Sequence, residues 1–368
     1  MNTKSHVVVI GGSFAGIKAT EVILSTNKDV QVTMISASSH AYFNVAAPRA
    51  LVEPKIAEQL FYPVKDKLKK LAPGKASFIL GTVKDIKFED NTVVYEESAG
   101  VEHSVAYDYL VVASGTKSHS AAFKLEGDYH LTKDAVLDLH AKIKNAENII
   151  IIGGGATAVE VAGELGETYG TKKKISLYAG SSGPLKSWLP KVSDAATKQL
   201  ESLNITVVNN VKYSSMEDAE DGKTKVIFDN GESQIVDLAI PAFGVIPNSD
   251  FIDVKFLDGQ GYLVVDENLT VKQYPNVLGF GDIVSGRPCT IVDLEQIQVS
   301  TFQSTVKSVI FGDNGKKKPL KKSPELGLVP VSRNGGVGVL FGWRVPSFLV
   351  RFIKSKDFMV SRGAKSFA

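Results

Sequence analysis

Two glycine-rich turns contain the residues whose types and spacing point most directly to chemistry. One spans residues 11–16 and the other residues 153–158, and each follows a run of aliphatic residues. In a dinucleotide-binding turn the first glycine permits the tight turn, the second lets the backbone approach a pyrophosphate, and a third small residue lets the next helix pack on the strand. The N-terminus of that helix offers free N–H groups to the phosphates. Two such turns in one chain predict a protein that holds two dinucleotides and passes electrons between them.

The two turns fit this pattern to different degrees. The first has Ser13 at its second glycine position, whereas the second has small residues at all three positions. We predict that both turns bind a cofactor. The residues concerned are Gly11, Gly12, Ser13, Phe14, Ala15 and Gly16 in the first turn, and Gly153, Gly155 and Ala158 in the second.

The position that usually recognises the ribose departs from the pattern in both units. An acidic residue is expected at the end of the second strand of each unit, but the sequence has Ser36 and Ala179 there. A serine can still hydrogen-bond a ribose hydroxyl, whereas alanine removes the carboxylate that would repel a 2′-phosphate. NADH and NADPH are therefore both admissible. Because no arginine stands beside Ala179, the sequence does not choose between them.

Three further strand ends follow in a characteristic order. One aliphatic run leads to Ala113 and Gly115, residues 237–244 repeat that pattern, and a third strand ends at Asp282. Each strand end or turn could by itself be an ordinary strand–helix junction. In this order they resemble the pyridine-nucleotide oxidoreductases with two dinucleotide folds, in which a nicotinamide domain is inserted into a flavin domain. The resemblance implies that Asp282 binds the ribityl chain of the flavin. We expect Val83, Ala113 and Gly115 to contact the flavin cofactor as well.

Two other stretches resemble the ferroptosis suppressor protein family, also called the apoptosis-inducing-factor-like mitochondrion-associated inducer of death family. They are residues 43–53, and residues 333–338 together with 350–357. Type II NADH dehydrogenases share the general plan. The resemblance implies FAD as cofactor, NADH or NADPH as electron donor and a quinone as acceptor.

The resemblance also suggests roles for two charged residues. Arg49 is expected to bind the flavin, with a surface salt bridge as the alternative. Glu160 occupies the superfamily's position near the nicotinamide and is the candidate catalytic residue. Its alternative is a carboxylate close to a helix N-terminus, which the helix dipole favours. The sequence leaves these alternatives open.

The expected fold class is α/β, with two Rossmann-like dinucleotide-binding domains. Residues 1–116 and 236–315 should form the discontinuous FAD domain, and residues 117–235 the inserted NAD(P)H domain. Residues 316–368 should form a small C-terminal segment. A chain of 368 residues is long enough for this arrangement.

The composition limits the electron acceptors and partners that the protein can use. The chain has one cysteine, Cys289, so it has no thiol pair and no disulfide framework. Since the flavin performs the redox step itself, electrons should leave it directly for a quinone, oxygen or another protein. The net charge of +2 gives no general attraction to nucleic acid. We interpret the lysine run at 316–322 as a solvated linker, with attraction to phospholipid or nucleic acid as the alternative. The run has no interleaved aromatic residues, which counts against nucleic acid.

The apolar and basic segment at 348–354 has two interpretations. It packs on the flavin domain, or it forms an interfacial helix at a membrane surface. The N-terminal residues leave no room for a targeting peptide, so we expect a cytoplasmic protein, with peripheral contact to the mitochondrial outer membrane, another intracellular membrane or a lipid droplet as the alternative. The rival functions are a death effector with secondary redox activity and an inactive nucleotide sensor. The sequence does not define an oligomeric state.

Overall fold

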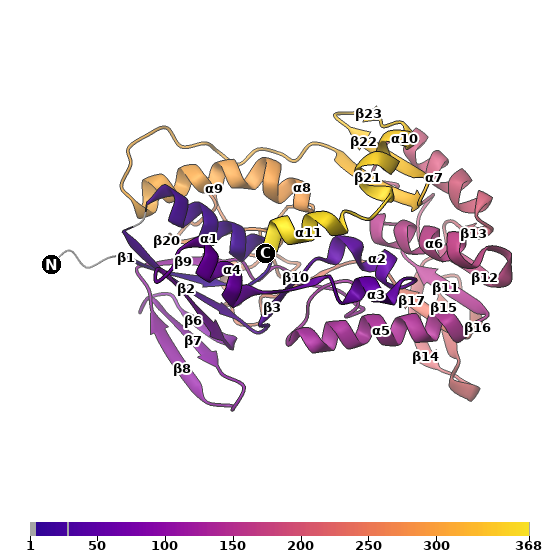
Figure 1. The fold of residues 1–368 in the computed structure, drawn as a ribbon, viewed down its shortest axis with the longest axis horizontal. Helices are drawn as coiled ribbons and strands as arrows, with labels where there is room; N and C mark the ends of the chain where they lie inside the picture. The colour runs from indigo at the N-terminus through magenta and orange to yellow at the C-terminus, as the bar shows by residue number, and fades with distance from the viewer. Residues whose placement is uncertain (1–4, 28, 368) are drawn as a thin grey trace.

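The computed structural model describes residues 5–27 and 29–367 and contains two parallel sheets that lie side by side with helices packed on them (Figure 1). The larger sheet has the strand order β19-β20-β9-β1-β2-β5, and β19 runs antiparallel to β20. These strands are β1 (Ser5–Ile10), β2 (Val30–Ser36), β5 (Ala76–Leu80), β9 (Tyr109–Val112), β19 (Thr270–Val271) and β20 (Tyr274–Gly279). This arrangement confirms the predicted α/β class.

The second sheet is the inserted unit, with the parallel order β13-β12-β11-β17. Its strands are β11 (Asn148–Ile152), β12 (Lys174–Tyr178), β13 (Ile205–Val208) and β17 (Leu238–Pro241). The aliphatic runs of β1 and β11 are central in their sheets and almost wholly buried. Strands covered on both faces must be apolar throughout, which is why the two runs are unbroken in the sequence.

Helices follow the first strand of each unit directly. The helix α1 (Phe14–Thr26) follows β1, and α6 (Ala156–Tyr169) follows β11. The other helices are α2 (Ala47–Ala50), α3 (Pro54–Ala57), α4 (Val64–Leu71), α5 (Tyr129–Asn145), α7 (Pro190–Ser202), α8 (Ile291–Asp293) and α9 (Val299–Thr305). Each unit also has an antiparallel sheet. One is β6 (Thr82–Lys87), β7 (Thr92–Glu96) and β8 (Glu102–Ala106), and the other is β14 (Tyr213–Asp218), β15 (Thr224–Phe228) and β16 (Ser233–Val236).

Strand pairing moves one expected domain boundary. Residues from 236 onward were expected in the FAD domain, but β17 pairs in parallel with β11 and so completes the second sheet. The chain returns to the first unit through β18 (Ile246–Pro247), which pairs with β10 (Thr116–Lys117) on the outgoing connection. The two connections between the units therefore run side by side. A short two-stranded sheet of β3 (His40–Tyr42) and β4 (Phe61–Pro63) flanks the larger sheet.

Residues 326–367 form a C-terminal subdomain. Its antiparallel strands are β21 (Leu326–Ser332), β22 (Gly335–Leu340) and β23 (Trp343–Arg344), followed by α10 (Ser347–Val350), a π-helical turn (Arg351–Ser355) and α11 (Val360–Phe367). The strand β21 packs on α6 of the second unit, and α11 contacts α1 of the first (Figure 1). The subdomain therefore bridges both units.

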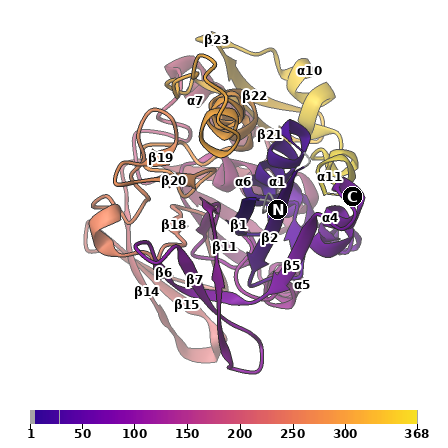
Figure 2. The ribbon, with the colours of Figure 1, turned by 90° about the vertical axis from the view of Figure 1, so that its left-hand side faces the viewer.

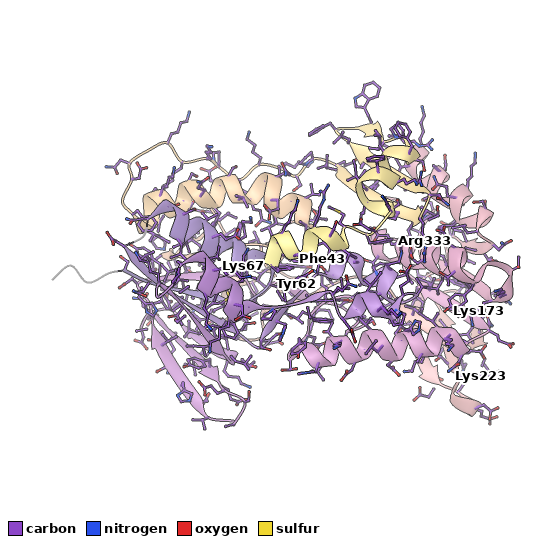
Figure 3. All side chains as sticks on the ribbon, in the orientation of Figure 1. Phe43, Tyr62, Lys67, Lys173, Lys223 and Arg333 are labelled. Atoms are coloured by element: carbon purple, nitrogen blue, oxygen red, sulfur yellow. The ribbon has the colours of Figure 1, made fainter. Side chains whose placement is uncertain are left out.

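The helix α11 contacts α1 and β4 of the first unit through aromatic side chains. Phe367 is buried, and its ring centroid lies 4.5 Å from that of Phe14 and 5.6 Å from that of Tyr62. Figure 3 shows the labelled Phe43 and Tyr62 beside this helix. Among the described residues, no helix combines the length and the apolar composition needed to cross a membrane.

Candidate functional site

A cavity of about 560 Å³ opens at the carboxyl-end edge of the larger sheet. The strands β1, β2, β9 and β20 are parallel, so their ends meet at this edge, which is where α/β sheets bind ligands. The predicted flavin-site residues that line the cavity are Gly11, Gly12, Ser13, Phe14, Ala15, Ser36, Val83, Ala113, Gly115 and Asp282. The structure thus brings together residues from five separate stretches of the sequence.

The first turn has the geometry that a pyrophosphate requires. Gly11 has φ +109°, and a Cβ atom there would lie 2.3 Å from the carbonyl oxygen of Ala113. A Cβ atom on Gly16, which lies behind the cavity lining, would be 1.8 Å from the Gly11 carbonyl oxygen. In the described structure no side chain caps the N-terminus of α1, and its first turn has no acidic residue. The free N–H groups of this helix therefore fit an anionic phosphate.

Ser36 lies beside this turn, as expected for a ribose contact. A Cβ atom on Gly12 would be only 2.8 Å from the Ser36 Oγ. The same Oγ accepts a hydrogen bond from the Ser38 backbone N–H at 3.2 Å, which fixes its position at the end of β2. Its hydroxyl can still donate to a ribose oxygen. The residues of this cavity fit a flavin dinucleotide in the hydrogen-bonding groups that they offer to its phosphates and ribose.

Asp282 has a partner that the sequence analysis missed. The Nζ of Lys124 lies 2.6 Å from Asp282 Oδ2 and donates a second hydrogen bond to Thr116 Oγ1, also at 2.6 Å. Lys124 lies on the connection between the two units and belongs to none of the recognised motifs. Lys124 itself also lines the cavity.

The second turn repeats the geometry of the first. Gly153 has φ +135°, and a Cβ atom there would lie 2.5 Å from the Ala242 carbonyl oxygen. The N-terminus of α6 has no acidic residue in its first turn and, within the described residues, no side-chain cap. This turn can accept a second pyrophosphate in the same way.

Two features lie close to Ala179 at the edge of the second sheet. A Cβ atom on Gly180 would lie 3.9 Å from Cγ of Lys212, so the aliphatic part of the Lys212 side chain lies next to Gly180. The Ala179 backbone N–H donates to the Val208 carbonyl oxygen at 2.9 Å. The next residue, Asn209, has a buried side-chain oxygen that finds no hydrogen-bond partner in the described structure.

Glu160 is a buried carboxylate with a partner from the C-terminal subdomain. The Nζ of Lys354 donates to Glu160 Oε1 at 2.6 Å, and both side chains are largely buried. Burial raises the pKa of Glu160 above its ordinary value, and the charge of Lys354 opposes that shift. Neither alternative from the sequence included this ion pair. Glu160 does not line the cavity of the first unit, and its contact with a nicotinamide stays a prediction.

Arg49 is also held in a buried ion pair rather than at the surface. Its Nε lies 2.5 Å from Glu164 Oε2 and its Nη2 lies 2.9 Å from Oε1, with side-chain exposures of 4% and 1%. The Nη2 atom also donates to the Ser355 carbonyl oxygen at 3.0 Å, and the guanidinium stacks 5.0 Å from the centroid of the Phe358 ring. Arg49 therefore links α2, α6 and the C-terminal subdomain. It does not line the cavity, so its flavin contact remains a prediction.

Cys289 has the surroundings of a structural thiol. Its Sγ donates to the Asp282 carbonyl oxygen at 3.6 Å. Burial, aided by the nearby Asp282 charge, raises the pKa of Cys289 to about 11. The thiol is therefore protonated at neutral pH, and a thiolate nucleophile is not available there.

Comparisons with known proteins agree with this geometry. The family model for pyridine nucleotide-disulphide oxidoreductase matches residues 5–304. Oxidoreductase ptaL of Pestalotiopsis fici is 34% identical over 363 residues, which cover 96% of each chain. Human ferroptosis suppressor protein 1 is 25% identical, with 98% of this chain and 95% of that protein covered. NDH2 from Plasmodium falciparum, solved with NADH, has a TM-score of 0.73 at 16% identity and covers 98% of this chain and 97% of that one. These matches confirm the resemblance noted in the sequence and the two-dinucleotide fold.

Proposed function

The chain belongs to the pyridine nucleotide-disulphide oxidoreductase family, and from this premise we propose that it is an FAD-dependent NAD(P)H:quinone oxidoreductase. Bound FAD would accept a hydride from NADH or NADPH and would pass the electrons to a quinone, with oxygen as the slower acceptor. The single observation that carries this proposal is the cavity at the edge of the larger sheet. Ten of the residues predicted for the flavin line it together.

The chain's own residues bind and orient in this proposal, while bound FAD supplies the hydride-accepting ring. The open N-termini of α1 and α6 hold the two pyrophosphates. Ser36 and Asp282 hydrogen-bond the sugar and ribityl hydroxyls of the flavin. Glu160 and Lys354 fix α6 against the C-terminal subdomain at 2.6 Å, which sets the position of the second turn.

The proposed acceptor follows from the absence of a cysteine pair that could form a redox-active disulfide. Cys289 is the one cysteine in the sequence, and burial raises its pKa to about 11. No second thiol exists to form a redox-active disulfide. A quinone is the acceptor that the resemblance of residues 43–53 and 333–357 to the ferroptosis suppressor protein family implies, and it is a direct acceptor that needs no protein thiol.

We expect the reduced flavoprotein to be reoxidised by a soluble ubiquinone analogue at least about tenfold faster than by air-saturated buffer, a barrier difference of roughly 1.4 kcal/mol. The enzyme is reduced with one equivalent of NADH without oxygen and mixed in a stopped-flow instrument with each acceptor. Replacing Cys289 with serine serves as the control and should leave both rates unchanged. Faster reoxidation by oxygen than by the quinone would identify an NAD(P)H oxidase instead.

Nucleotide preference gives a separate prediction at Ala179. Replacing it with glutamate restores a carboxylate that repels a 2′-phosphate, so kcat/KM for NADPH should fall by about tenfold or more while that for NADH changes little. In the wild type, the missing carboxylate and the neighbouring Lys212 should keep the two kcat/KM values within about tenfold, or roughly 1.4 kcal/mol.

The matched control is Ala179→Gln, which adds similar bulk without charge. Equal losses in the glutamate and glutamine variants would show that size, not charge, is responsible. A wild type that already discriminates a thousandfold against NADPH would refute the role given to the missing carboxylate.

A further inference from the structure

A buried glutamine lies directly behind the strand end that carries Asp282. Gln298 is 1% exposed and does not line the flavin cavity. Its Oε1 accepts a hydrogen bond from the backbone N–H of Gly281 at 2.9 Å. Gly281 and Asp282 both line the cavity. Gln298 therefore supports the cavity wall from the protein side, without reaching the cavity itself.

The turn at Gly281 packs tightly against the start of α1. Gly281 has φ +88°, and a Cβ atom there would lie 2.4 Å from Cβ of Ala15. The helical stretch that carries Gln298 also runs beside α1, as Figures 1 and 2 both show for the orange helix. The N-terminus of α1 fits a pyrophosphate, and Asp282 directly follows Gly281. A shift of this turn would thus disturb two flavin contacts together.

An unusual helical turn brings Gln298 into its position. Residues Leu294–Gln298 form a π-helical segment between α8 and α9, in which the Val299 N–H donates to the Leu294 carbonyl oxygen. In a regular α-helix, side chains five residues apart point about 140° away from each other. The wider π turn brings such side chains closer together, and here Gln298 Nε2 donates to Asp293 Oδ2 at 2.7 Å. Segments of this kind are frequent at functional sites.

Asp293 is the centre of a buried charged cluster. Its carboxylate accepts from Arg287 Nε at 3.0 Å, from Arg287 Nη2 and from the Ser323 hydroxyl. Arg287 also donates to the Lys321 carbonyl oxygen at 3.0 Å, so the chain that leads to the C-terminal subdomain is fastened to the same cluster. Since an ionised carboxylate only accepts and a backbone N–H only donates, the Gln298 amide can bridge the cluster and the cavity turn in one orientation alone.

We propose that Gln298 is a positioning residue for the flavin. It holds the Gly281 N–H, and this keeps the Asp282 carboxylate directed at the ribityl chain. Asp293 and Arg287 hold the amide in the orientation that this contact requires. This role presupposes the FAD site proposed above. An apolar side chain of the same length would fill the space, but the Gly281 N–H would lose its buried partner and the turn would be free to shift.

The FAD affinity of Gln298→Met tests this role. A dilution series of the FAD-saturated protein measures the affinity, because flavin fluorescence rises as FAD leaves. We expect the dissociation constant to rise by about tenfold or more, since a buried donor loses its acceptor. The matched control is Thr305→Val. It removes a buried hydrogen bond, from Thr305 Oγ1 to the Asn268 carbonyl oxygen at 2.7 Å, at the end of α9 and outside the cavity lining. The control should bind FAD like the wild type.

Gln298→Glu separates hydrogen bonding from packing. A protonated carboxyl group both accepts and donates, so it can replace the amide, whereas an ionised one faces the like charge of Asp293. The charged groups around this position are Asp293 and Arg287 in the cluster, and Asp282 with Lys124 on the turn. Relative to the wild type at the same pH, Gln298→Glu should bind FAD about tenfold more weakly at mildly alkaline pH and recover at mildly acidic pH. Gln298→Met should show no recovery.

The outcomes distinguish this role from the FAD site itself. If the wild type binds FAD and Gln298→Met binds it as tightly as Thr305→Val does, the positioning role is refuted while the flavin site stands. Equal losses in Gln298→Met and Gln298→Glu at every pH would also refute it, because packing alone would then be responsible. If Gln298→Met does not fold, the pH dependence of Gln298→Glu decides. A wild type that takes up no FAD would refute the flavin site and this role with it.

Discussion

Replacing Arg49 with alanine should lower the free energy of unfolding by about 3–5 kcal/mol, because it leaves a buried carboxylate without its partner. Glu164 has a side-chain exposure of 1% and receives two hydrogen bonds from Arg49, at 2.5 and 2.9 Å. The same substitution removes a donor to the Ser355 carbonyl oxygen and the stacking on Phe358. Chemical denaturation at neutral pH measures the loss. A loss below about 1 kcal/mol, which is typical of a surface ion pair, would contradict the stabilising role of the buried pair.

The same pair gives the variant a characteristic pH dependence. Burial raises the pKa of Glu164, and Arg49 opposes that rise. Without Arg49, the pKa of Glu164 in the folded state should therefore rise further above its value in the unfolded chain. The folded variant then binds more protons than the unfolded chain, and its stability falls as pH rises through this range. We expect Arg49→Ala to recover part of its loss at mildly acidic pH. The double variant Arg49→Met with Glu164→Leu removes both charges. It should recover most of the lost free energy of unfolding at neutral pH.

Replacing Asp282 with alanine should weaken FAD binding by about 10- to 150-fold, the value of a charged hydrogen bond of roughly 1.5–3 kcal/mol. Asp282 lines the cavity, and Lys124 holds its carboxylate in place at 2.6 Å. Flavin content after purification and titration of the apoprotein with FAD both measure the effect. The control is Asp250→Ala, because Asp250 lines the same cavity but has a side-chain exposure of 93%. Equal affinities of the Asp282 and Asp250 variants for FAD would remove Asp282 from the site.

The flavin site was the most predictable part of the molecule. Its residues belong to local motifs at strand ends, and parallel strands bring their ends to one edge of the sheet. Gly11, Ser36, Val83 and Asp282 therefore line one cavity although they are far apart in the sequence. The boundary at residue 236 shifted because β17 completes the second sheet, a strand pairing that the chain order does not reveal.

The charged contacts between the units were not predictable from local pattern. Arg49 pairs with a residue 115 positions away, and Lys354 with one 194 positions away. Such pairs depend on how the C-terminal subdomain packs on α6. Lys124 and Gln298 belong to no motif, and only their placement beside Asp282 and Gly281 indicates a role.

The most direct test of the central claim is the visible absorption spectrum of the purified protein before and after NADH or NADPH is added without oxygen. The two dinucleotide sites predict a yellow protein with the bands of oxidised flavin, which either nucleotide bleaches at one equivalent per chain. Acid should release the flavin intact as FAD, since no residue indicates a covalent link. A colourless protein that takes up no FAD, or a bound flavin that neither nucleotide reduces, would contradict the account.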